Sequence, residues 1–173
     1  MCEGPDEKAV IDILLNNDCL QFSRDDLIGQ TPFHIRQLKP PVTTDIKHYG
    51  QPIMIYRIGD KQTDKLKIPK ELKDLIFNEN IKKYCTKPEL EVLMIITEGL
   101  YHQFQKSKLS PSEFAKINIS CNGKKYNKSV EFINDYYSVK GVDDLVHSIR
   151  EYKRIKKRTH LANEGCLADL LKE

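Results

Sequence analysis

The feature that most constrains the fold is a nearly continuous run of apolar residues in the first third of the chain. Between Ile53 and Ile58 almost every residue is β-branched, aromatic or otherwise apolar. Strands with one face in water alternate apolar and polar residues, whereas strands covered on both faces do not. The run ends at Gly59 and Asp60. We therefore expect a strand inside a mostly parallel sheet, with Asp60 at its carboxyl end.

Strand-like and helix-like segments alternate around this run, which is typical of an α/β fold with right-handed crossovers. We expect further strands at 19–23 and 81–85, and helices at 5–14, 68–80 and 87–105. Beyond residue 106 the pattern becomes helical, with segments at 110–117, 129–137, 142–155 and 166–173 and a turn at 122–128. The sequence therefore predicts an α/β core over 1–106 and a basic helical extension over 107–173, packed on the core.

The first helix begins unusually close to the start of the chain. Pro5 suits a first helical position, because its missing N–H would have been unpaired there. The Glu3-Gly4 pair before it is typical of the end of a buried strand, yet only Met1 and Cys2 precede the pair. Either the start of this strand is truncated or this edge of the fold is built unusually, and we expect Glu3 to have little backbone pairing and to be held loosely.

Carboxylates stand at the ends of two of the predicted strands. Glu3 and Asp60 stand at strand ends, and Asp64 lies four residues after Asp60. The carboxyl ends of parallel strands face one crevice, where two carboxylates 4 Å apart repel by about 4 kcal/mol at an effective dielectric near 20. A divalent cation such as Mg²⁺ or Mn²⁺ offsets this repulsion and suits phosphodiester chemistry. The alternative is that each carboxylate separately caps a helix or faces water.

Glu91 is a second kind of candidate. It lies within "LEVLMII", a helical stretch that is apolar almost all round, where an unpaired carboxylate would be costly. We expect a partner for it, which is a cation, a backbone cap or a metal ion. Glu98 falls on the same helical face seven residues later, whereas Glu89 suits the helix dipole.

Positive charge is concentrated in the second half of the chain. The net charge is +3, but residues up to Glu98 hold 14 basic and 16 acidic side chains. The densest basic run is "REYKRIKKR", and its cations are Arg150, Lys153, Arg154, Lys156, Lys157 and Arg158. Such a run is either a solvated helix face or a contact for nucleic-acid phosphates.

Several classes of protein are disfavoured. No apolar run approaches about 18 residues, so a membrane span is not expected, and the opening residues do not form a secretory signal. The five cysteines show no zinc or disulfide spacing, which favours a reducing cytoplasm. A glycine-rich phosphate loop is also missing from the sequence.

Two stretches, "CEGPDEKAVIDILL" (residues 2–15) and "RIGDKQTD" (57–64), resemble the TOPRIM domain of topoisomerases, primases and overcoming-lysogenization-defect nucleases. A third, "CTKPELEVLMIITEG" (85–99), is similar to a motif of RloB-like TOPRIM proteins. The chain as a whole also resembles small bacterial proteins that share "DCLQFSRDDL", "PELEVLMII" and "ADLL".

The resemblance implies roles for Glu3 and Asp60, to which Asp64 and Glu91 are added as candidates. Glu3 matches the general acid or base at the scissile phosphate, and Asp60 matches a magnesium ligand. The second ligand position, 62, is Gln here, so Asp64 is the nearest candidate, with Glu91 as a further carboxylate of the site. The implied function is Mg²⁺-dependent cleavage of DNA or RNA, in bacterial defence or a mobile element. The alternative is a non-catalytic module that binds nucleic acid or a partner ATPase.

Overall fold

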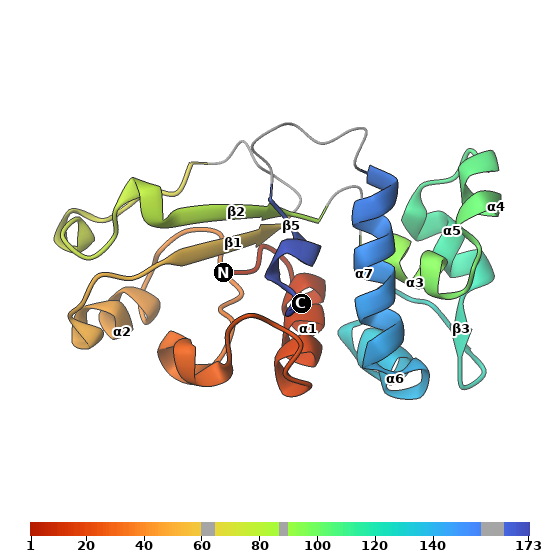
Figure 1. Ribbon diagram of the computed structural model, residues 1–173, viewed down its shortest axis with the longest axis horizontal. Helices are drawn as coiled ribbons and strands as arrows, with labels where there is room; N and C mark the ends of the chain where they lie inside the picture. Colours follow the sequence, from red (N-terminus) through yellow and green to blue (C-terminus); the bar gives the residue numbers. More distant parts are fainter. Residues whose placement is uncertain (60–64, 87–89, 157–164) are drawn as a thin grey trace.

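A computed structural model describes residues 1–59, 65–86, 90–156 and 165–173 (Figure 1). The fold is α/β, as expected from the sequence. Its sheet is parallel and has the order β1 (Ile55–Gly59), β2 (Ile81–Cys85), β5 (Gly165–Cys166). Figure 1 shows this sheet and α2 (Val42–Tyr49) toward one end of the longest axis, with α3 to α7 toward the other.

Short pairings extend the sheet beyond the free side of β1. Cys2 forms parallel bridges with Ile58 on one side and His34 on the other. The Glu3 N–H donates to the Ile58 carbonyl at 2.9 Å, and the Cys2 N–H donates to the Phe33 carbonyl at 2.8 Å. The expectation that Glu3 has little backbone pairing is therefore wrong, because the residues around His34 supply an outer neighbour for this very short segment.

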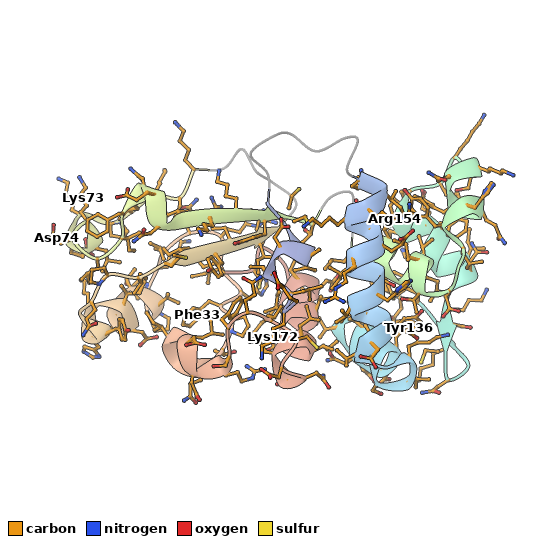
Figure 2. All side chains as sticks on the ribbon, in the orientation of Figure 1. Phe33, Lys73, Asp74, Tyr136, Arg154 and Lys172 are labelled. Carbon is orange, nitrogen blue, oxygen red and sulfur yellow. The ribbon has the colours of Figure 1, made fainter. Side chains whose placement is uncertain are left out.

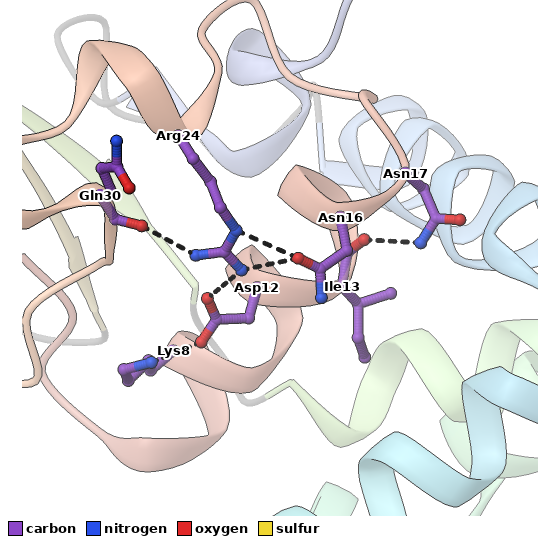
Figure 3. Close-up of polar contacts among 7 residues, drawn as sticks. All are labelled: Lys8, Asp12, Ile13, Asn16, Asn17, Arg24 and Gln30. Atoms are coloured by element: carbon purple, nitrogen blue, oxygen red, sulfur yellow. Dashed lines mark hydrogen bonds and ion pairs between the residues drawn. The ribbon is translucent and has the colours of Figure 1, made fainter.

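Helix α1 (Pro5–Asn16) begins at Pro5, as predicted, and its first turn is acidic. Arg24, in the segment that follows α1, forms hydrogen bonds with side chains of this helix (Figure 3). The Arg24 guanidinium donates to the Asp12 carboxylate at 2.8 Å, to the Asn16 side-chain oxygen at 2.7 Å, and to the Gln30 carbonyl at 3.1 Å. These bonds fix the 3₁₀ turns η1 (Arg24–Asp26) and η2 (Ile28–Gln30), which precede the stretch beside Cys2.

Two predicted elements of the first half are absent from the described residues. At 19–23 there is no strand, only an isolated bridge between Leu20 and Leu171. At 68–80 the expected helix is replaced by the 3₁₀ turns η3 (Lys70–Leu72) and η4 (Asn78–Asn80). A single turn already buries Leu72 and Ile76, and an apolar pair at this spacing does not distinguish one helical turn from three.

The predicted helix at 87–105 is two helices, α3 (Glu91–Thr97) and α4 (Tyr101–Lys106), in the part that the structure describes. Gly99 separates them with a φ of +68°, in the left-handed region that ends helices. The apolar pattern continues across the break, which is why it predicts one helix.

The C-terminal part is mostly, but not entirely, helical. Helix α5 (Pro111–Asn118) begins at the predicted capping box, and α6 (Val130–Lys140) and α7 (Val142–Lys156) follow. Between α5 and α6 lies an antiparallel hairpin of β3 (Ser120–Cys121) and β4 (Lys124–Lys125). The prediction of a helix at 166–173 is wrong. This segment begins within β5, which pairs with β2, and continues as the 3₁₀ turn η5 (Leu167–Leu170).

Two apolar clusters lie on opposite faces of the sheet. The larger includes Ile58 and residues of α1, α3, α5, α6, α7 and η5, so both halves of the chain contribute to it. The smaller is formed by Leu38, Val42, Ile46, Ile55, Leu72 and Ile76. Among the described residues, no helix is long and apolar enough to span a bilayer.

Candidate functional site

Glu3 lies beside the carboxyl end of β1. Since Cys2 pairs with Ile58 in parallel register, the next residues, Glu3 and Gly59, are neighbours across the two strands. A Cβ atom on Gly59 would collide with the Glu3 side chain, so glycine leaves the space that this carboxylate occupies. Asp60, which follows Gly59 in the sequence, and Asp64 lie outside the described residues.

The Glu3 carboxylate is buried and ion-paired. Its side chain is 7% exposed, and the nearest Arg57 nitrogen, from a side chain 5% exposed, lies 3.7 Å away. This pairing compensates for removing both charges from water. A second arginine, Arg36, is exposed and donates to the Glu3 backbone carbonyl at 3.5 Å. Glu3 is therefore held in place by its backbone and by two cations.

The start of α1 carries a further carboxylate toward β2. The Thr86 N–H, just beyond β2, donates to the Gly59 carbonyl at 3.1 Å, and the Thr86 hydroxyl donates to the Glu7 carboxylate at 3.4 Å. The Glu7 side chain folds over Gly4 so closely that a Cβ atom there would collide with it. The Glu3-Gly4 pair thus brings two carboxylates to the ends of β1 and β2.

Glu91 has the partner that the sequence predicts, and that partner is a cation together with a phenol. The Tyr126 hydroxyl donates to the Glu91 carboxylate at 3.0 Å, and the Lys128 ammonium lies 3.8 Å from the same oxygen. The pKa of Asp6 is raised, first by burial and then by the negative charge of Glu91, while Lys128 opposes the shift. Asp6 and Glu91 therefore share one electrostatic environment.

These contacts define an acidic edge, which consists of Glu3, Asp6, Glu7 and Glu91. Carboxylate oxygens are the donors that Mg²⁺ prefers. Within the described ranges, no three His, Cys, Asp or Glu side chains are grouped so as to hold a metal ion. The roles of Asp60 and Asp64 as metal ligands stay predictions, as does that of Glu91.

Sequence reasoning missed two residues of this edge and three residues that contact it. In the sequence, Asp6 and Glu7 are explained by the positive end of the helix dipole alone. Arg57, Tyr126 and Lys128 receive no role. The one available signal is Arg57, a charged residue inside the otherwise apolar run at 53–58, which requires a buried counter-charge.

The basic run at the end of α7 has internal partners wherever it is described. The partners are a backbone carbonyl for Arg150 at 2.9 Å, Asp169 for Lys153, Glu151 for Arg154 at 2.6 and 2.7 Å, and the Tyr152 ring for Lys156. Lys157 and Arg158 lie outside the described residues. Figure 2 labels Arg154 on α7. A phosphate would have to compete with these contacts.

Glu98 is engaged in packing between helices. It accepts hydrogen bonds from the Tyr136 hydroxyl at 2.7 Å and from the Lys140 ammonium at 2.9 Å. Burial works to raise the pKa of Glu98, but the bonds from Tyr136 and Lys140 outweigh it and hold this pKa below its usual value.

No protein-family model, curated protein or solved structure significantly matches this chain. The α/β fold and the acidic edge therefore carry the functional argument.

Proposed function

We propose that this protein cleaves phosphodiester bonds in nucleic acid with the help of Mg²⁺ or Mn²⁺, in the manner of TOPRIM nucleases. The observation that carries the proposal is the position of Glu3 beside Gly59, on adjacent parallel segments, with Asp60 next in the sequence. Neighbouring carboxyl ends in a parallel sheet are where α/β proteins place their chemistry.

The residues take the following roles in this proposal. Glu3 acts as the general acid or base, while Asp60, Asp64 and Glu91 supply oxygen ligands to the metal. The bound metal would stabilise the charge that develops on the phosphate. Arg57 orients the Glu3 carboxylate, and the exposed Arg36 is available to a phosphate oxygen next to it. Tyr126 fixes the direction of the Glu91 carboxylate.

The test combines cleavage with thermal melting. Single- and double-stranded DNA and RNA are incubated with the protein in Mg²⁺, Mn²⁺ or EDTA, and products are resolved on a gel. We expect metal-dependent cleavage that Glu3→Gln and Asp60→Asn each abolish. We also expect metal to raise the melting temperature of the wild type and of Glu3→Gln, but not of Asp60→Asn, because only the latter loses a ligand.

Asp74→Asn is the matched control, since Asp74 is an exposed carboxylate far from the acidic edge (Figure 2). It should cleave and bind metal like the wild type. Normal cleavage by Glu3→Gln, or an equal metal-induced shift in Asp60→Asn, contradicts the assignment of that residue.

The alternative proposal is a non-catalytic module that binds nucleic acid or a partner ATPase. The observation that favours it is the buried ion pair of Glu3 with Arg57, because this pair already compensates the charge of the Glu3 carboxylate without a bound ligand. This alternative predicts oligonucleotide or ATPase binding without cleavage under every metal condition. In either case we propose a role in bacterial defence or a mobile element.

A further inference from the structure

Exposed positive charge without internal partners is grouped on the hairpin before α6. Residues 114–130 contain four lysines and no acidic residue. Lys124 and Lys125 are exposed and form no ion pair or side-chain hydrogen bond with any described residue, unlike the described cations of the basic run on α7. We call residues 120–128 the lysine hairpin.

The lysine hairpin is a preorganised element. Its turn residues Asn122 and Gly123 have φ of 49° and 75°, as the centre of a type I′ turn requires. Cys121 and Tyr126 are buried, and the Tyr126 N–H donates to the Ile119 carbonyl at 3.0 Å. Little backbone entropy is therefore lost when the lysines of such a hairpin bind a ligand.

The lysine hairpin leads directly to the acidic edge. Tyr126 and Lys128 both contact Glu91, from within the hairpin and at its end. Lys125 is three residues from Lys128, so their Cα atoms are at most about 11 Å apart. A chain of phosphates that contacts Lys124 and Lys125 can thus continue toward Glu91, where Lys128 already offsets the negative charge.

We propose that the lysine hairpin is the principal electrostatic contact for the nucleic-acid backbone, with Lys124 and Lys125 each neutralising a phosphate. This inference rests on the proposed nucleic-acid function. It assigns to the hairpin the role that sequence reasoning gave to the basic run on α7. The contacts are to phosphates and carry no sequence preference, since lysine ammonium groups on a short hairpin act as point charges.

The test is binding in EDTA, where metal-dependent cleavage cannot occur. Fluorescence anisotropy with a labelled single strand and the matching duplex, both of mixed sequence, gives log K against log salt. The double variant Lys124→Gln/Lys125→Gln should bind more weakly and lower the slope by about 1 for each lysine. Lys124→Arg/Lys125→Arg should bind like the wild type.

The matched control removes the same charge from the opposite end of the molecule. Lys70→Gln/Lys73→Gln changes two exposed lysines at or next to η3, and Figure 2 shows Lys73 far from the hairpin. This control should leave the slope unchanged. Circular dichroism of each variant should match the wild type, because all four side chains are exposed.

Three outcomes overturn the proposal: an unchanged slope in Lys124→Gln/Lys125→Gln, an equal fall in the control variant, or binding of anionic vesicles without binding of oligonucleotide. The proposed cleavage can fail independently. A wild type that binds oligonucleotide through the lysine hairpin but never cleaves supports the hairpin and rejects the nuclease.

Discussion

At the scale of single residues, Asp169 joins the end of the sheet to α7. Its carboxylate accepts from the Cys166 N–H at 2.7 Å and from the Lys153 ammonium. Burial works to raise the pKa of Asp169, but these bonds prevail and lower it. The bond to Asp169 raises the pKa of Lys153 in turn.

Asp169 should therefore make stability depend on pH in the acid range. Because its pKa is lower in the folded than in the unfolded protein, its contribution is present above the unfolded value of about 3.9 and is lost as the pH falls through the folded value. Asp169→Asn should cost about 1 kcal/mol of unfolding free energy at pH 7, because it removes the negative charge that strengthens the bond from the Cys166 N–H and that pairs with Lys153, and solvent screens this half-exposed pair.

Urea unfolding of Asp169→Asn and wild type, at neutral pH and below the folded pKa, measures this difference. It should shrink markedly in acid. Asp74→Asn, whose carboxylate is exposed, serves as the control and should match the wild type at both pH values. An equal loss at both pH values would assign the effect of Asp169→Asn to packing.

Single residues also show where sequence reasoning ends. The burial of Glu91 and its need for a partner follow from its apolar neighbours, and both are confirmed. The identity of the partners does not follow, because Tyr126 is 35 residues away and nothing local connects the two. The charge of the basic run is likewise visible in the sequence, but its internal partners are not.

At the scale of elements, the break between α3 and α4 depends on the backbone of Gly99. The φ of +68° is costly for other residues, whereas a Cβ atom at this position would meet no other atom within 4 Å. Gly99→Ala should therefore destabilise the protein by about 1 kcal/mol through the backbone alone, while Gly99→Asn should cost less.

Thermal or urea unfolding of both variants checks this prediction. Equal or greater stability of Gly99→Ala would mean that α3 and α4 can join into the single helix that the apolar pattern predicts. Gly4→Ala provides a contrast, because Gly4 does not have a left-handed φ. Any loss of stability in that variant would come from contact between the new Cβ atom and the Glu7 side chain.

The elements that the sequence predicts well are those with long, locally encoded patterns. The parallel strands β1 and β2 and the helices α1, α5, α6 and α7 belong to this group. Strand β5 does not, because its two residues become a strand only through pairing with Tyr84 and Cys85, about 80 residues away.

At the scale of the whole molecule, the end of the described chain packs into the main core together with α1. Leu170 and Leu171 are buried in the same cluster as α1. The Gln21 N–H donates to the Leu170 carbonyl, and the Lys172 N–H donates to the Cys19 carbonyl, both at 2.9 Å. Residues from both ends of the sequence therefore share one packed core (Figure 1).

The protein should consequently unfold in a single cooperative transition. Near- and far-ultraviolet circular dichroism, measured as it unfolds, should therefore give the same midpoint. Leu170→Ala should lower the unfolding free energy by about 2–5 kcal/mol and shift both signals together, because its side chain is 2% exposed. Separate midpoints for the two signals, or a loss confined to one of them, would show that residues 107–173 unfold independently.

The pairing of Gln21 with Leu170 and Leu171 also determines how late in synthesis the core can be completed. The side chain of Gln21 finds its Leu171 partner only after 150 further residues have been added. At 5–20 residues per second, that interval lasts on the order of 10 s. Throughout this interval the apolar cluster that contains α1 lacks Leu170 and Leu171, so the nascent chain exposes part of this cluster to the ribosome and to chaperones before the core is complete.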